Sequence, residues 1–181
     1  PILVRELERR LRREAENLAL DIIRRNRRSQ LMRRPIQDTR VLGLSPGLRM
    51  GCQLAVLDEN GKLLETTTIY PHTPRNEKEK SRETIARLVD EHDISVAAIG
   101  EGTGSKESEK LLSRVIEENC PDLKFTVLSE DPAKTYSGSS QANRELPGMK
   151  KNMRVAVFLA RQMLDPLREL TKIKLRDLCS A

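Results

Sequence analysis

The part of the chain from residue 41 to residue 70 predicts three consecutive β-strands joined by tight turns. The first expected strand, Val41–Leu44, is apolar throughout and ends at a Ser-Pro-Gly turn. The second, Gly51–Leu57, is followed by Asn60-Gly61, a pair that supplies the positive φ angles of a two-residue hairpin turn. The third, Lys62–Tyr70, is rich in threonine, which strands favour. The folded part of the chain is therefore expected to begin with hairpin-linked strands.

Helices and strands are expected to alternate over the rest of the chain. A helix with Ile85 and Leu88 on its apolar face precedes Val96–Gly100, a short apolar run that suits a central strand covered on both faces. A second helix around Leu111 leads to the fifth expected strand, Lys124–Leu128. This β-β-β-α-β-α-β-α order predicts an α/β fold: a mixed five-stranded sheet with helices on its faces, plus an added N-terminal helix and a C-terminal helix.

The segment between the fifth strand and the last long helix shows no periodic pattern. Residues 129–148 contain Asp131-Pro132 and Pro147-Gly148, and they are expected to form a long loop that is either functional or mobile. Helical periodicity returns from Met149. Asp165-Pro166 then predicts a stop, followed by a short helix with Asp165 as its cap and Pro166 in its first turn.

The N-terminal segment carries all of the excess positive charge. Residues 1–40 contain twelve Arg against six Asp and Glu, which equals the net charge of +6 of the whole chain. Leu3, Leu7 and Leu11 begin an apolar stripe at helical spacing, so one long amphipathic helix is predicted over residues 2–30. Two interpretations are open: a nucleic-acid arm, or a connecting helix that packs on a neighbouring domain. The glutamates interleaved with the arginines favour the connecting helix.

The sequence is expected to divide into three parts. Residues 1–38 form the Arg-rich helix leading from an upstream domain, residues 39–165 form the folded domain, and residues 166–181 start a further helical connection. Because the chain begins at Pro1 without a methionine, we expect it to be a piece of a longer protein. No apolar run approaches the length of a membrane span, and the three cysteines lack any C-x-x-C pair. We therefore expect a cytoplasmic protein with reduced thiols and no membrane partner.

Three segments of the sequence together resemble the YqgF (RuvC-like) domain of the bacterial transcription accessory protein Tex. They are VLGLSPGLRMGCQLAVLDENGKLLETTTIYP, AAIGEGTGSKESEKLL and RVAVFLARQMLDPLREL. The resemblance implies a ribonuclease H-like fold in a multidomain cytoplasmic protein, with nucleic acid and the transcription machinery as partners. It also implies that residues 166–181 lead to a helix-hairpin-helix region, and that the family's RNA-binding OB-fold domain lies outside this sequence.

The resemblance further locates three positions at which RuvC-like nucleases carry acids. The first is Ser45, a neutral hydroxyl; the second is Glu101, which keeps its carboxylate; the third falls at Lys151–Arg154, where the chain offers cations and no acid. Nucleases of this type need several carboxylates around two metal ions. We therefore predict a degenerate nuclease fold without catalytic residues, metal or other cofactor, in which Glu101 pairs with Arg154 or Lys151 or caps the following helix. The alternative is a RuvC-like nuclease acting on structured nucleic acid, with Mg²⁺ or Mn²⁺ at Glu101.

Four cations are the expected contacts to nucleic acid: Arg49, Lys150, Arg154 and Arg161. Arg154 and Arg161 share one helical face, and Arg49 follows the Ser-Pro-Gly turn. Aromatic residues make up only 2% of the chain, so stacking platforms for bases are scarce. We therefore expect weak, sequence-independent and salt-dependent binding, with the choice between RNA and DNA left open.

Two further motifs are weaker. Gly102-Thr103-Gly104-Ser105 precedes a helix, whose free amides could hold an anion, but a plain strand-to-helix turn is the favoured interpretation. His72 and His92 are expected to have no neighbouring partner for acid–base chemistry, which leaves a nucleophile triad without support.

Overall fold

The computed structural model of the chain describes residues 2–31 and 34–173. The chain divides into two compact units, residues 1–33 and residues 34–181. The first unit holds a single helix, α1 (Ile2–Leu31), which confirms the long helix predicted from the leucine spacing. Near the N-terminus of α1, Arg9 and Glu6 form an ion pair of 3.9 Å at a spacing of three residues, as expected for a charged helix face. The large apolar side chains of α1 that the structure describes are more than half exposed: Leu7, Leu11, Leu18 and Ile22.

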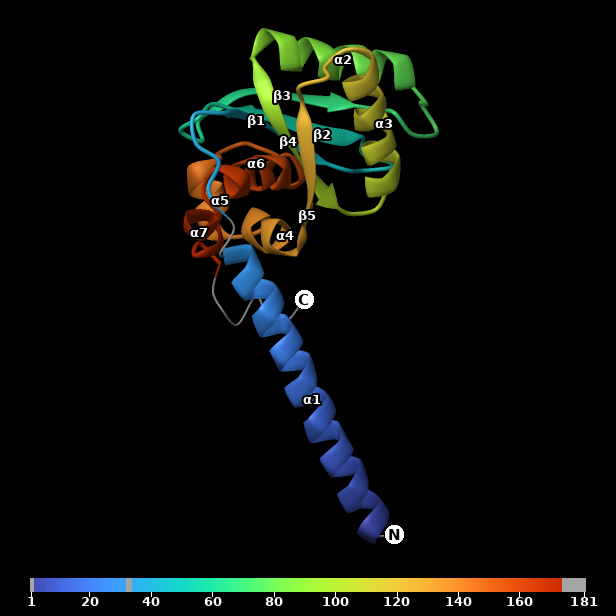
Figure 1. Cartoon of the computed structure of the whole chain (residues 1–181), viewed down its shortest axis with the longest axis vertical. Coiled ribbons are helices and arrows are strands. Elements are labelled where there is room, and N and C mark those ends of the chain that lie inside the picture. The colour runs from blue at the N-terminus through green and yellow to red at the C-terminus, as the bar shows by residue number, and fades with distance from the viewer. Residues whose placement is uncertain (1, 32–33, 174–181) are drawn as a thin grey trace. The chain divides into compact units, whose positions relative to one another are not determined.

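The second unit is built on a mixed five-stranded sheet with the strand order β3-β2-β1-β4-β5 (Figure 1). Its strands are β1 (Arg40–Ser45), β2 (Cys52–Leu57), β3 (Leu63–Ile69), β4 (Ile94–Glu101) and β5 (Lys124–Ser129). The strand β2 pairs antiparallel with β1 and with β3, whereas β4 runs parallel to β1 and to β5. The predicted mixed sheet is therefore confirmed, and its parallel part places the carboxyl ends of β1, β4 and β5 at one edge.

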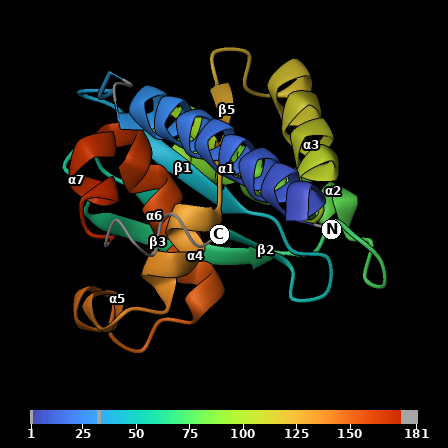
Figure 2. The ribbon, with the colours of Figure 1, turned by 90° about the horizontal axis from the view of Figure 1, so that it is seen from below.

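Helices cover both faces of this sheet. The helices α2 (Lys78–Glu91) and α3 (Ser105–Glu118) lie on one face. The helix α6 (Lys151–Leu164) crosses the other face, with α4 (Asp131–Ser137) and α7 (Pro166–Leu170) packed beside it (Figure 1; Figure 2). Successive side chains of a strand point to opposite faces, so the sheet supports two separate apolar cores.

The strand β1 illustrates how the two cores are divided. Leu42 and Leu44 belong to the core under α2 and α3, whereas Val41 belongs to the core under α6. Gly43 lies on the α6 side, where a Cβ atom would come within 2.0 Å of the Ala156 carbonyl oxygen. Only glycine at this position therefore allows α6 to pack directly on the backbone of β1.

The expectation of a loop over residues 129–148 is wrong, because this segment contains two short helices, α4 and α5 (Ser140–Glu145). Pro132 occupies the first turn of α4, where proline is well tolerated. The Ser139 hydroxyl caps α5 by accepting a hydrogen bond of 3.1 Å from the amide of Ala142. Tyr136 packs on Phe158 of α6 with ring centroids 5.1 Å apart. Helices of seven and six residues are too short to show a helical period in the sequence.

The end of the described chain agrees with the sequence. Asp165 caps α7, because its carboxylate accepts a hydrogen bond of 2.9 Å from the amide of Arg168. The helix itself starts at Pro166. None of the helices in the described ranges is long and apolar enough to cross a bilayer.

Candidate functional site

The carboxyl ends of the three parallel strands meet at one edge of the sheet. Ser45 ends β1, Glu101 ends β4, and Ser129 ends β5 in register with Glu101. The next residue, Glu130, begins the turn into α4. Sheets of this kind form their sites at this edge. The sequence comparison with RuvC-like nucleases led to Ser45 and Glu101, but it missed Glu130, although an acid directly after a parallel strand could have indicated it.

Ser45 and Glu130 are joined to each other in the interior. The Ser45 hydroxyl donates a hydrogen bond of 2.9 Å to Oε1 of Glu130, and the two residues are only 6% and 3% exposed. The other carboxylate oxygen of Glu130 forms an ion pair of 3.1 Å with Lys134. A Cβ atom at Gly100 would lie 2.2 Å from Oε1, and one at Gly102 would lie 2.5 Å from Oε2. The two glycines therefore make the space that the Glu130 carboxylate fills.

Glu101 lies apart from this pair. Its side chain is exposed, and it forms no hydrogen bond or ion pair with any residue that the structure describes. The expected pairing with Arg154 or Lys151 is therefore wrong. The expected capping role is also wrong, because Gly104, with a φ angle of +95°, is the N-cap residue of α3. Gly104 lies in the segment predicted as a plain strand-to-helix turn, and a positive φ angle explains why a glycine stands there.

The acids at this edge do not form a two-metal site. Such a site needs several carboxylate oxygens that are free to bind the ions. Both carboxylate oxygens of Glu130 already have partners, Ser45 and Lys134. Ser45 itself carries a hydroxyl where a RuvC-like nuclease has a carboxylate. The residues therefore do not fit a pair of Mg²⁺ or Mn²⁺ ions.

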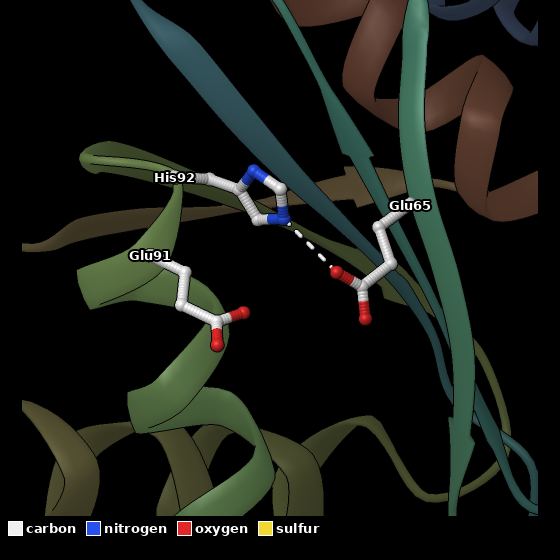
Figure 3. A group of neighbouring side chains, drawn as sticks. All are labelled: Glu65, Glu91 and His92. Atoms are coloured by element: carbon white, nitrogen blue, oxygen red, sulfur yellow. Dashed lines mark hydrogen bonds and ion pairs between the residues drawn. The ribbon is translucent and has the colours of Figure 1, made fainter.

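Within residues 2–31 and 34–173, one group of three potential metal ligands lies close together: Glu65, Glu91 and His92 (Figure 3). It is close to the opposite end of β1, since the His92 carbonyl oxygen accepts a hydrogen bond of 3.0 Å from Arg40, the first residue of that strand. His92 Nε2 lies 3.0 Å from Oε2 of Glu65, so the expectation that His92 has no neighbouring partner is wrong.

Arg87 already supplies a positive charge to this group. Its guanidinium donates a hydrogen bond of 2.9 Å to Oε1 of Glu65 and also bonds to Glu91. The hydrogen bonds from His92 and then from Arg87 lower the pKa of Glu65. The cluster is thus an ion-pair network between β3 and α2, in which Arg87 neutralises charge on the two glutamates.

The second histidine lies beside a thiol. Nε2 of His72 is 3.5 Å from Sγ of Cys52, which in turn lies 3.7 Å from the Ser108 hydroxyl. Burial raises the pKa of the Cys52 thiol and lowers the pKa of His72. A cysteine acts as a nucleophile in its thiolate form, and these shifts favour the neutral forms of both groups. The geometry brings a cysteine and a histidine together without activating either one.

A positively charged hollow of the domain lies between β3 and the start of α6. We call it the basic groove and define it by its four cations: Arg49, Arg75, Lys150 and Lys151. It has a volume of about 890 Å³, and none of its lining side chains is acidic. Threonine side chains of β3 add further polar groups to the lining, and the Arg75 guanidinium lies 4.0 Å from the centre of the Tyr70 ring. The groove therefore combines positive charge with hydrogen-bond donors.

The structure brings together two of the four cations expected to contact nucleic acid and separates the other two. Arg49 and Lys150 both line the basic groove. Arg154 is buried, and its Nη1 donates to the Ser137 carbonyl oxygen at 3.2 Å and to the Asn143 side chain. Arg161 lies in a different hollow, where it donates to the Gly61 carbonyl oxygen and to Glu145, each at 3.1 Å. Two groove cations, Arg75 and Lys151, were not among the expected contacts to nucleic acid, although Lys151 was named at a degenerate catalytic position.

Comparisons with known proteins identify one protein family. Residues 39–164 match the family model described as the Tex protein YqgF-like domain. Over 170 residues the chain is 43% identical to the protein tex of Bordetella pertussis, covering 93% of this chain and 21% of that protein. It is 35% identical over 177 residues to the human S1 RNA-binding domain-containing protein 1, covering 96% of this chain and 18% of that protein. The chain thus spans about a fifth of the length of these relatives.

A comparison with a solved structure identifies the fold. Thermus thermophilus RuvC in complex with a Holliday junction substrate superposes with a TM-score of 0.52 and 14% sequence identity. The match covers 68% of this chain and 91% of RuvC. At this level of identity the likeness concerns the fold, which is the RuvC-like, ribonuclease H-like arrangement implied by the sequence.

Proposed function

Because the chain belongs to the family of Tex protein YqgF-like domains, we propose that it is a non-catalytic module that binds nucleic acid through the basic groove. The observation that carries this proposal is the groove itself, with four cationic side chains and no acidic one. Phosphate groups are the ligands that such a lining attracts most strongly, because binding releases the counterions condensed on the nucleic acid. Contacts to phosphates carry no base information, so binding would be independent of sequence.

Two features support the non-catalytic part of the proposal. The hydroxyl of Ser45 stands where RuvC-like nucleases have an acid, and it is bound to Glu130. The start of α6, where those nucleases have another acid, carries Lys150 and Lys151 and faces the basic groove. Cations at this place would hold a phosphate backbone, whereas they would repel the metal ions needed to cleave it.

The longer relatives suggest the setting in which the module works. Since the chain spans about a fifth of their length, we propose that it acts within a longer transcription accessory protein in the cytoplasm. Its partners would be the transcription machinery and the helix-hairpin-helix and OB-fold domains of the same protein. One relative is named for an S1 RNA-binding domain, which supports an association of the whole protein with RNA.

Fluorescence anisotropy with labelled RNA and DNA, single-stranded and duplex, tests the proposal on the 181-residue chain. Four phosphate contacts predict that log K falls against log salt with a slope of about −3 to −4. Replacing Lys150 and Lys151 by Ala should weaken binding about tenfold or more and make the slope less steep by about 1.5. The control, Lys62→Ala with Lys124→Ala, removes two exposed lysines at the other end of the sheet, where the parallel strands begin. It should leave the affinity and the salt slope close to those of the wild type.

Two results would overturn the proposal. Equal binding by the groove variant and the control variant would show that the groove is not the binding surface. Cleavage of a branched or single-stranded substrate with Mg²⁺ or Mn²⁺, abolished by Glu101→Gln or Glu130→Gln, would show that the domain is a nuclease. A metal-dependent nuclease is the alternative function. The observation that favours it is the pair of acids, Glu101 and Glu130, at the carboxyl ends of the parallel strands β4 and β5.

A further inference from the structure

A compact loop between β1 and β2 separates the basic groove from a second positively charged hollow. We call residues 47–51 the wedge loop. Its two ends are glycines in close contact: a Cβ atom at Gly47 would lie 2.5 Å from the Gly51 carbonyl oxygen, and Gly51 has a φ angle of +78°. The side-chain amide of Gln53 donates to the carbonyl oxygens of Met50 at 3.2 Å and of Gly51 at 3.3 Å. The loop is thus closed at its base, and the Gln53 side chain is hydrogen-bonded to its second half.

The tip of the wedge loop exposes apolar side chains on both sides of an arginine. Leu48 is 41% exposed and Met50 is 63% exposed, with Arg49 between them. Among the described residues of the domain, only two other large apolar side chains are exposed, Leu64 and Leu167. Two of these four side chains therefore lie within three residues of each other on the wedge loop.

Each exposed side chain faces a different hollow. Met50 lines the basic groove, whereas Leu48 lines a hollow of about 430 Å³ between α2 and α3, which we call the α2–α3 pocket. Part of Leu48 rests on Gly104, where a Cβ atom would lie 3.0 Å from Cδ2 of the leucine. The α2–α3 pocket contains one acid, Glu107, against four cations: Lys78, Arg82, Lys110 and Arg114.

Three of these four cations are available to a ligand. Arg82 is engaged with Glu118 at 2.9 Å and with Glu79. Lys78, Lys110 and Arg114 form no ion pair with any residue in the described ranges. The α2–α3 pocket therefore offers unneutralised positive charge on the far side of the wedge loop, at the same edge of the sheet as the basic groove.

The aromatic residues of the chain offer little free surface on which bases could stack. Tyr136 and Phe158 are buried, and Phe125 packs against the core beneath α2 and α3. Tyr70, the last of the four, carries the Arg75 guanidinium over its ring. Aliphatic side chains are therefore the exposed apolar groups that the wedge loop offers to bases, and proteins that unstack bases do use leucine and methionine in this way.

We propose that the wedge loop inserts Leu48 and Met50 between the bases of a nucleic acid whose phosphates occupy the basic groove on one side and the α2–α3 pocket on the other. The proposal rests on the function proposed above for the basic groove. It adds a substrate class: single strands, or duplexes with a bulge or a branch, in which bases can be separated at low energetic cost. Positive charge on both sides of the loop favours a nucleic acid over an uncharged apolar partner.

The test uses the 181-residue chain and a single strand that carries 2-aminopurine, whose fluorescence rises when its base is unstacked. Wild-type protein should raise the fluorescence on binding. The double variant Leu48→Ser with Met50→Ser should abolish this rise and weaken binding about tenfold. Its salt slope should stay unchanged, because every lysine and arginine remains. The matched control is Leu64→Ser, which alters a leucine that is 42% exposed and lines neither hollow.

A second variant tests the path of the phosphate backbone. Lys110→Ala with Arg114→Ala removes two cations of the α2–α3 pocket and should make the salt slope less steep by about 1.5 for a strand long enough to reach both hollows. A dinucleotide, whose single phosphate cannot occupy both hollows at once, should not distinguish this variant from the wild type.

The outcomes separate this inference from the proposed function. One outcome is that the Lys150/Lys151 variant loses affinity while the Leu48/Met50 variant matches Leu64→Ser in affinity and fluorescence. In that case the basic groove binds nucleic acid, and the proposed insertion of Leu48 and Met50 between bases is wrong. If neither variant changes the binding, both proposals are wrong. Circular dichroism of each variant, compared with the wild type, establishes that the loss of binding does not reflect a loss of folding.

Discussion

The hydroxyl of Ser45 donates a hydrogen bond to the carboxylate of Glu130 across 2.9 Å, joining the end of β1 to the start of α4. The two residues are 85 positions apart in the chain, and both are buried. Since Lys134 neutralises the same carboxylate, the edge of the sheet that would face a metal ion in a nuclease is closed by an internal polar contact. This relationship makes Ser45 a structural residue.

The substitution Ser45→Ala should lower the free energy of unfolding by about 1–3 kcal/mol. The change leaves a buried carboxylate oxygen of Glu130 without its donor, and a hydrogen bond to a charged group contributes about that much. Urea denaturation measures the effect. Ser95→Ala, at an exposed position of β4, is the control and should change stability by less than about 0.5 kcal/mol. Equal effects of the two substitutions would mean that the contact with Glu130 contributes nothing to stability.

The substitution Ser45→Asp should make stability fall as the pH rises. Two carboxylates at this distance cannot both ionise easily, so the pKa of one of them would be raised in the folded state. A group with a raised pKa in the folded protein lowers stability above its unfolded pKa, which is about 4 for a carboxyl. The free energy of unfolding measured at pH 8 should therefore be lower than at pH 5, with no comparable difference in Ser45→Ala. A flat pH profile would show that the new carboxylate turns away from Glu130.

The strands were predictable because each has a strong local signal. Asn60-Gly61 marks the hairpin, and the apolar run at Val96–Gly100 marks the central parallel strand. The helices α4 and α5 were not predictable from periodicity, since each makes fewer than two turns and depends on packing against α6. Their stability is tertiary, and single-sequence patterns do not report it.

The candidate site was predictable only in part, because the sequence does not show which side chains the short helices α4 and α5 bury. Arg49 and Lys150 were both expected to contact nucleic acid, and the structure places them in one groove. The position of Arg154 was different: its place on an amphipathic helix looked the same as that of an exposed cation, and its burial depends on α4 and α5, which the sequence did not reveal. Glu130 was missed because the comparison with nucleases considers acids on β1, β4 and α6, and this acid follows β5.

The substitution Arg154→Met should destabilise the domain more than it weakens nucleic-acid binding. It leaves the Ser137 carbonyl oxygen and the Asn143 amide oxygen without their donor, which we expect to lower the free energy of unfolding by about 1–3 kcal/mol. Hydrogen exchange should become faster in α4 and α5. Anisotropy at a temperature where the variant is folded should show less than a threefold loss of affinity. A large loss with unchanged stability would mean that Arg154 contacts phosphate, as its sequence position suggested.

The substitution Gly43→Ala should prevent α6 from packing on β1. The new Cβ atom would lie 2.0 Å from the Ala156 carbonyl oxygen, a backbone atom that cannot move without shifting the helix. We expect a loss of more than about 3 kcal/mol, seen as a large fall in the midpoint of thermal unfolding. Gly138→Ala is the control, because only one atom, the Thr135 carbonyl oxygen, lies within 4.0 Å of the added group. Similar midpoints for the two variants would contradict the close approach of α6.

The acid sensitivity of the domain should depend on Glu145. Partial burial raises the pKa of this carboxyl, but hydrogen bonds from Lys172, Gln141 and Tyr136 outweigh the burial and lower the pKa below its ordinary value to about 2. A group whose pKa is lowered in the folded state stabilises the protein above its unfolded pKa and loses that effect as the pH falls. The free energy of unfolding should therefore decline between about pH 4.5 and pH 2, by an amount on the order of 2–3 kcal/mol from this group.

Glu145→Gln should remove this decline, and urea denaturation at several pH values measures it. The variant should be less stable than the wild type at pH 7 and about equal to it near pH 2. Glu169 shares Lys172 with Glu145, but burial raises its pKa, so its titration changes stability in the opposite direction and leaves the acid-side decline to Glu145. The control is Glu83→Gln, at an exposed position of α2, which should follow the wild-type profile. A wild-type profile for Glu145→Gln would show that its hydrogen bonds with Tyr136 and Lys172 are no stronger for a charged acceptor than for a neutral one.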